Sequence, residues 1–220
     1  MDARKFQRRL ALLNKWGYPV IPLTQAIDDL DEGRLPKSAT VITIDDGWYS
    51  TYVHMLPALL AHSYPATIYL TTYYCVNQAP VIDVALDYCF HQIDSARCPE
   101  IHISDFAFGP LPTGTDQEKA LALAAAVDAI SKLQDDAKRQ LFLQSVCKKA
   151  DVDYEKLLAE RWFHLMNADE VQDAAEKGIT VELHTHHHRI THNDQDCLEQ
   201  ELALNSGCIE DVTGRIPVHF

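Results

Sequence analysis

The chain has 220 residues, of which 47% are apolar and 23% are charged, and its formal net charge is −13. This composition excludes a disordered chain, a collagen-like fibre and a coiled coil. A nucleic-acid partner is not expected, because an acidic surface repels phosphate backbones. No run of 18 apolar residues is present, and the basic amino-terminal segment lacks the apolar region of a secretory signal. We therefore expect a soluble, cytoplasmic protein without a membrane span, and the composition leaves its oligomeric state open.

Two residue types stand out by number or position. The six cysteines form no CxxC pair, and in a chain without a secretory signal we expect reduced, mostly buried thiols. There are eleven histidines, and four of them fall between residues 184 and 188. This cluster is the most informative feature of the composition.

The first 72 residues alternate between strand and helix patterns. Residues 2–16 place apolar side chains three or four positions apart, which predicts an amphipathic helix ending at Gly17. The elements expected next are a strand at 18–23, a helix capped by Thr24 and running to Asp31, a strand at 41–45, a helix at 49–62 and a strand at 66–71. This order favours a parallel sheet with helices outside it.

The pattern changes between about residues 75 and 165, which we interpret as a mostly helical insertion in a single domain spanning residues 1–220. Its predicted elements are helices at 83–93, 116–133, 134–150 and 152–161 and a short strand at 101–106. Thr115 and Glu118 have the spacing of a capping box at the start of the second helix.

The alternation resumes after the insertion. Asn167 and Glu170 can cap a helix that runs to Gly178, and residues 180–184 are apolar and β-branched enough for a strand. A last helix at 193–212 carries an apolar face made by Leu198, Leu202, Ile209 and Val212. A further strand is expected to begin at 217, so the chain is expected to stop inside a strand.

Two carboxylates stand where the strand at 41–45 meets a turn, in the run Thr43-Ile44-Asp45-Asp46-Gly47. In proteins with parallel sheets, ligands bind at the carboxyl ends of the strands. One of the two carboxylates could therefore bind a metal while the other accepts or donates a proton. The same run is also typical of an ordinary turn, with glycine supplying a positive φ.

A second group, His184-Thr185-His186-His187-His188, directly follows the strand at 180–184. His184 and His188 are four residues apart, so a helical turn there would bring both imidazoles to one side, where they could bind one ion. Two histidines and one carboxylate form a recurring metal-binding set that leaves positions open for water and substrate. A solvated polar loop remains the alternative.

Together, the two motifs resemble those of the polysaccharide deacetylase family (carbohydrate esterase family 4), whose catalytic unit is the NodB homology domain. Its first motif is T-F-D-D-G, here with Ile44 in place of Phe, and its second is H-S/T-x-x-H, matched by His184, Thr185 and His188. The resemblance covers most of residues 5–72 and 166–220. It implies an α/β fold, namely a distorted, incomplete (β/α) barrel of the NodB type with the helical insertion.

The resemblance also implies a role for each matching residue. Asp46, His184 and His188 would bind a divalent metal, and Asp45 would be the catalytic base that takes a proton from the attacking water. Thr185 would hold the histidine loop by a hydrogen bond. The ligand types favour Zn²⁺, although Co²⁺, Ni²⁺ or Fe²⁺ fit the same set. The implied activity is removal of N- or O-acetyl groups from an acetylated saccharide.

One part of the family pattern is missing from these residues. The third motif is expected to begin at His219-Phe220, and the histidine that acts as general acid belongs to a later motif. We therefore expect this chain to bind a metal but to deacetylate poorly, unless His186 or His187 supplies the proton.

Two other functions remain open. The chain could be a catalytically incomplete fragment that binds metal or sugar. The other alternative is that the His-x-His run is the metal motif of a PHP or amidohydrolase barrel, where it normally lies near the amino terminus.

Overall fold

The computed structural model describes residues 2–133, 135–188 and 194–220. The chain forms two compact units. The first unit comprises Met1–Gln78 and His164–Phe220, and the second comprises Ala79–Phe163. None of the helices in the described ranges has both the length and the apolarity needed to cross a membrane.

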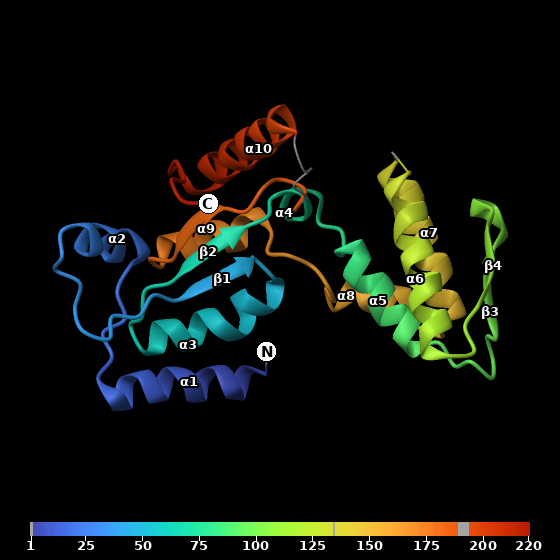
Figure 1. Ribbon diagram of the computed structural model, residues 1–220, viewed down its shortest axis with the longest axis horizontal. Helices are drawn as coiled ribbons and strands as arrows, with labels where there is room; N and C mark the ends of the chain where they lie inside the picture. Colours follow the sequence, from blue (N-terminus) through green and yellow to red (C-terminus); the bar gives the residue numbers. More distant parts are fainter. Residues whose placement is uncertain (1, 134, 189–193) are drawn as a thin grey trace. The chain divides into compact units, whose positions relative to one another are not determined.

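The first unit is built on a parallel sheet of three strands in the order β1-β2-β5. Figure 1 shows β1 beside β2. The strands are β1 (Thr43–Asp46), β2 (Thr67–Leu70) and β5 (Thr180–Leu183). The predicted parallel pairing is confirmed, while the described strands form an open sheet rather than a closed barrel. In the register, the last residues of the three strands lie side by side. Segments that follow the strands therefore meet at one edge.

Helices pack around this sheet. They are α1 (Ala3–Trp16), α2 (Leu23–Asp31), α3 (Leu56–Ala61), α4 (Tyr73–Asn77), α9 (Ala168–Glu176) and α10 (Gln195–Thr213), with a π-helical turn at Thr51–Met55 before α3. Helix α1 contacts α3, and α10 contacts both α9 and β5. The apolar faces of α1, α3, α9 and α10 enclose one core with the strands, and α2 contributes no buried residue to it. The core includes Leu10, Leu59, Ile68 and Ile209.

Three local predictions for the first unit are wrong. Residues 18–23 form no strand, and only Val20 pairs there, with Thr40. Thr24 does not cap α2, because the helix already begins at Leu23 after Pro22 and has no side-chain cap. Residues 217–220 form no strand either. The backbone N–H groups of Val218 and His219 instead donate to the carboxylate of Glu182, which replaces part of a strand ladder.

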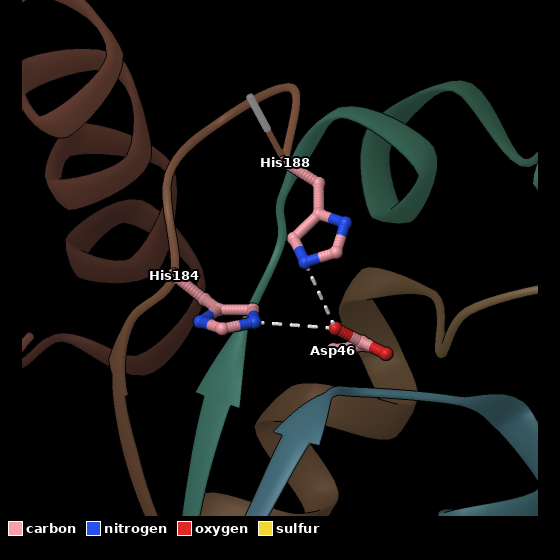
Figure 2. Close-up of side chains that lie close together, drawn as sticks. All are labelled: Asp46, His184 and His188. Carbon is pink, nitrogen blue, oxygen red and sulfur yellow. Dashed lines mark ion pairs between the residues drawn. The ribbon is translucent and has the colours of Figure 1, made fainter. Parts of the chain in front are cut away.

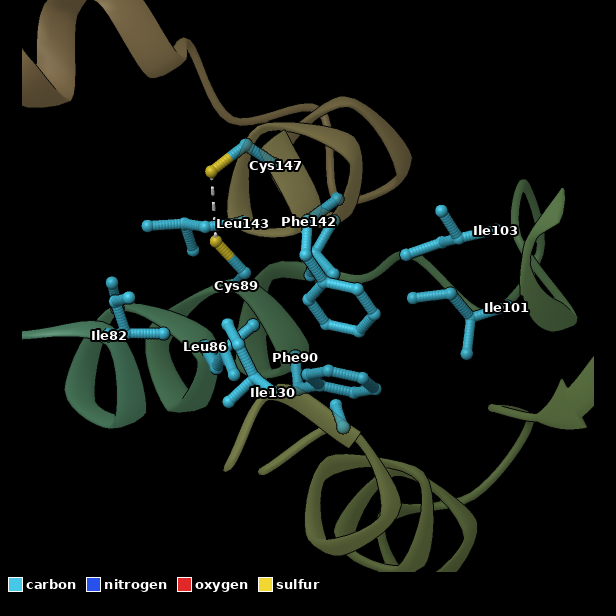
Figure 3. Close-up of a cluster of buried hydrophobic side chains, with 14 of the residues drawn as sticks. Ile82, Leu86, Cys89, Phe90, Ile101, Ile103, Ile130, Phe142, Leu143 and Cys147 are labelled. Carbon is cyan, nitrogen blue, oxygen red and sulfur yellow. Dashed lines mark hydrogen bonds between the residues drawn. The ribbon is translucent and has the colours of Figure 1, made fainter. Parts of the chain in front are cut away.

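The second unit has its own core beneath helices and a hairpin (Figure 3). Its elements are α5 (Ile82–Gln92), β3 (Glu100–Ile103), a 3₁₀ turn at Ser104–Phe106, β4 (Phe108–Pro112), α6 (Asp116–Ser131), α7 (Asp136–Lys149) and α8 (Tyr154–Ala159). The sequence pattern misses β4, because its Gly109 and two prolines are atypical of a strand. The capping box of Thr115 and Glu118 is confirmed.

The cysteines are less buried than the sequence predicts. All six cysteines are free, but only Cys75, Cys89 and Cys147 are buried, so the expectation of mostly buried thiols is too broad. Cys89 and Cys147 lie in the second core with their sulfurs 3.4 Å apart. The predicted helix ends at residues 134 and 193 lie outside the described residues.

Candidate metal centre

The candidate centre lies at the carboxyl edge of the parallel sheet. Asp46 is the last residue of β1, and His184 follows the last residue of β5. Asp46 and Leu183 both lie beside Leu70, the last residue of the middle strand. Residues 43–47 and 184–188 are therefore brought together by strand pairing, although almost 140 positions separate them in the sequence.

The turn after β1 has an unusual backbone. Asp46 has φ 70° and Gly47 has φ 82°, so two consecutive residues occupy the left-handed region. Gly47 is required for a second reason, because a Cβ there would lie 2.3 Å from Cδ1 of Leu70. Such strained conformations persist where the surrounding structure holds them, and they cluster at functional sites.

Three side chains converge at this turn (Figure 2). Nε2 of His184 lies 3.2 Å from Oδ1 of Asp46, and Nε2 of His188 lies 3.4 Å from the same oxygen. The ligand atoms of all three lie within 4.8 Å of one another. Two ligands of a tetrahedral ion with bonds of about 2.0–2.2 Å are roughly 3.3–3.6 Å apart. The donor set and its spacing therefore fit a divalent metal.

Asp46 is also oriented by its second oxygen. The indole Nε1–H of Trp48 donates to Oδ2 of Asp46 at 2.8 Å, so Oδ1 is left facing the histidines. The hydrogen bond from His184 lowers the pKa of Asp46. The bond from Trp48 and the charges of both histidines lower it further, against the opposing effect of burial. The carboxylate is thus held in its ionised form, the form that binds a metal.

The structure does not bring Asp45 into this group of three. Asp45 is exposed and lies opposite Tyr69 in the sheet register. Burial, followed by the charges of Glu182 and Asp45, raises the pKa of Tyr69. Asp45 is therefore a solvent-accessible carboxylate directly beside the turn, and its catalytic role stays a prediction.

His186 and His187 point to other partners. Nδ1 of His186 lies 2.8 Å from Oγ1 of Thr72, and Nδ1 of His187 lies 2.7 Å from Oε1 of Glu201. The pair that faces Asp46 is thus His184 with His188, four residues apart. A His-x-His pair of His184 with His186 does not form there.

The expected hydrogen bond of Thr185 is wrong. Its hydroxyl oxygen is buried and has no hydrogen-bond partner among the described residues, and its φ is 61°. The loop is held instead by side chains of other segments, which donate to or accept from its backbone. These side chains belong to Thr71, Glu201 and Asn205.

Sequence reasoning missed these three supporting residues, although a signal for one was present. Asn205 continues the apolar stripe of α10, three residues after Leu202 and four before Ile209, and it is fully buried. A polar side chain on an otherwise apolar helix face indicates a buried hydrogen-bonding role. Thr71 and Glu201 carried no comparable signal.

Known structures share this architecture. No protein-family model matches the sequence, and no curated protein matches it. A de-N-acetylase from Aggregatibacter actinomycetemcomitans has a TM-score of 0.50 and 15% sequence identity, with 98% of this chain and 66% of that chain covered. The BpsB deacetylase domain from Bordetella bronchiseptica has a TM-score of 0.49 and 16% identity, with 96% and 65% covered.

The chain thus spans slightly less than two thirds of the length of each of these structures. At this level of identity, the likeness is one of fold. The resemblance to polysaccharide deacetylases that the two motifs predict is therefore confirmed at the level of the fold.

Proposed function

We propose that this protein is a metal-dependent hydrolase that removes N- or O-acetyl groups from a saccharide. The observation that carries the proposal is the meeting of two imidazole nitrogens, from His184 and His188, at one carboxylate oxygen of Asp46. An ordinary solvated loop does not require two imidazole nitrogens to lie 3.2 and 3.4 Å from one carboxylate oxygen. The shared fold with a de-N-acetylase supports the choice of reaction.

The three ligands suit Zn²⁺ by type, and Co²⁺, Ni²⁺ or Fe²⁺ fit the same set. When bound, such an ion supplies Lewis acidity toward the acetyl carbonyl and makes water a better nucleophile near neutral pH. Three protein ligands leave room in the coordination shell, which is typical of catalytic rather than structural sites.

The protein supplies orientation and a base. Trp48 holds Asp46 so that one carboxylate oxygen faces the histidines. Asp45, exposed beside the turn, takes the proton from the attacking water in this proposal, a role that typically contributes a factor of about 10²–10⁴ in rate.

The proposal also includes the fold of the complete catalytic domain. We infer that the parallel sheet of β1, β2 and β5 is part of a distorted (β/α) barrel of the NodB type in a single catalytic domain. The second unit, Ala79–Phe163, would then be the insertion that the sequence pattern places at about 75–165.

The test is a paired measurement of metal content and acetate release. Protein purified without a histidine tag is loaded with Zn²⁺, analysed for metal, and incubated with N-acetylated and O-acetylated oligosaccharides. We expect one metal per chain in wild type, near-complete loss in His188→Ala, and retention in His54→Ala, a matched change at an exposed histidine of the same unit. Equal metal content in His188→Ala and His54→Ala would contradict the proposed centre.

Acetate release separates the remaining alternatives. Metal-dependent release that disappears in His188→Ala supports the hydrolase. Metal binding without acetate release from any substrate would favour the catalytically incomplete metal- or sugar-binding protein.

A further inference from the structure

The peptide groups on both sides of His184 are held by buried side chains from other segments. Oδ1 of Asn205 accepts the backbone N–H of His184 at 2.8 Å, and the hydroxyl of Thr71 donates to the backbone carbonyl of His184 at 3.2 Å. Asn205 is 0% exposed and Thr71 is 2% exposed. His184 thus begins its loop with both of its backbone polar groups fixed.

The same two residues connect His184 to the other strands. The backbone N–H of Thr71 donates to the carbonyl of Asp46 at 3.3 Å, so Thr71 bonds to the backbone of two of the three candidate ligands, Asp46 and His184. The amide of Asn205 donates to the carbonyl of Leu70 at 2.9 Å and to Oγ1 of Thr72 at 3.0 Å. From its position on α10, Asn205 therefore hydrogen-bonds to the carboxyl end of β2 and to the residue that follows β5.

This arrangement matters because the residue directly after His184 does not support the loop through its own side chain. Thr185 has a positive φ, and its buried hydroxyl makes no hydrogen bond within the described residues. The hydrogen bonds of Thr71 and Asn205 therefore fix the backbone from which the His184 side chain reaches Asp46. Buried polar groups that lose their partners cost free energy, so a fully bonded network favours one arrangement over others.

We propose that Thr71 and Asn205 are positioning residues of the metal centre, which hold His184 at the separation from Asp46 that an ion requires. This proposal rests on the proposed function, because it assumes that the centre binds a metal. Neither residue needs to touch the metal. Their effect is transmitted through the backbone of His184, and supporting residues around metal ligands typically change affinity by about 10–100-fold.

Two variants remove the network, and each has a control of the same kind. Asn205→Leu keeps the approximate shape but removes every bond of the amide, and Thr71→Val removes only the hydroxyl. The control for Asn205→Leu is Ile209→Ala, which leaves a cavity in the apolar core one turn further along α10. Thr67→Val makes the same chemical change as Thr71→Val at the opposite end of β2.

The probe is Co²⁺ alone, followed by its visible absorption, at a temperature where circular dichroism shows that each protein is folded. We expect Asn205→Leu and Thr71→Val to bind Co²⁺ about 10–100-fold more weakly, with a changed absorption spectrum. Ile209→Ala and Thr67→Val should bind within about twofold of wild type with an unchanged spectrum, even where their melting temperatures fall.

Two outcomes would overturn the positioning role. Wild-type affinity and spectrum in both network variants would overturn the positioning role, and so would equal losses in the control variants. If Asn205→Leu does not fold, Thr71→Val and its control decide the question. If wild-type protein binds no Co²⁺, the proposed function itself fails, and the positioning role falls with it.

Discussion

At the scale of single residues, Asp46 is constrained through both of its carboxylate oxygens and through its backbone. One of its oxygens faces two histidines, the other accepts an indole N–H, and its backbone occupies the left-handed region. His188 likewise has a positive φ of 57°. A strained backbone at two candidate ligands is consistent with a site whose geometry is imposed by the fold.

The bond from Trp48 makes a first prediction at this scale. Trp48→Phe keeps an aromatic ring but removes the donor to Asp46, so the carboxylate gains freedom to rotate. We expect metal affinity to fall about tenfold, measured by competition with a chromophoric chelator. Trp16→Phe, at an exposed tryptophan of α1, should leave affinity unchanged. Equal affinity in both variants would show that Trp48 does not orient the ligand.

The two neighbouring aspartates make a second prediction. Asp45→Asn should retain the metal and lose roughly 10²–10⁴-fold in the rate of acetate release, because an amide cannot act as a base. Asp46→Asn should lose the metal itself. The measurements are metal content and initial rate on the same samples. Loss of metal in Asp45→Asn, with retention in Asp46→Asn, would mean that the roles are exchanged.

At the scale of secondary-structure elements, the two units each contain a helix with a complete capping box. In α9, Asn167 and Glu170 exchange bonds of 2.9 and 2.8 Å between side chain and backbone. In α6, Thr115 and Glu118 do the same at 2.9 and 3.2 Å. These helix starts were predictable because capping depends on residues only three positions apart.

The capping boxes make a third prediction. Asn167→Ala and Thr115→Ala should each lower the free energy of unfolding by about 1 kcal/mol, because each leaves an amide N–H of the first turn without its partner. Urea denaturation followed by circular dichroism measures the change. Thr115 belongs to the second unit, and Asn167 caps α9 and is not among the candidate ligands, so we expect Co²⁺ affinity to be unchanged in both variants. A loss of affinity in Thr115→Ala would contradict the assignment of the centre to the first unit alone.

At the scale of the whole molecule, the described residues form two apolar cores, one in each unit. All three candidate ligands and their supporting residues belong to the first unit. Stability of the second core and metal binding should therefore be separable by mutation.

A fourth prediction follows from this separation. Phe142 is fully buried in the second core, so Phe142→Ala should cost about 3–5 kcal/mol in unfolding free energy while Co²⁺ affinity stays at the wild-type level. Leu70 packs in the first core and its side chain lies against Gly47. Leu70→Ala should therefore lower both stability and affinity. Limited proteolysis and Co²⁺ titration measure the two effects, and weaker binding in Phe142→Ala would contradict the separation.

The local features of this protein can be predicted from its residues alone. They include most helices, the three parallel strands, both capping boxes and the identity of the residues that meet at the candidate centre. These features depend on spacing over a few residues or on short motifs, such as TIDDG and HTHHH, whose chemistry can be interpreted directly.

How those residues are held depends on contacts between distant parts of the chain. The bonds of Asn205 to His184 and Leu70 join positions that are 21 and 135 residues apart, and no local pattern encodes such a pairing. The same holds for the carboxylate of Glu182, which accepts the backbone N–H groups of Val218 and His219 next to one backbone bond from Leu183 to His219. Thr185, the residue expected to hold the loop, has no hydrogen-bond partner for its hydroxyl among the described residues, and the backbone of His184 is bonded by Thr71 and Asn205.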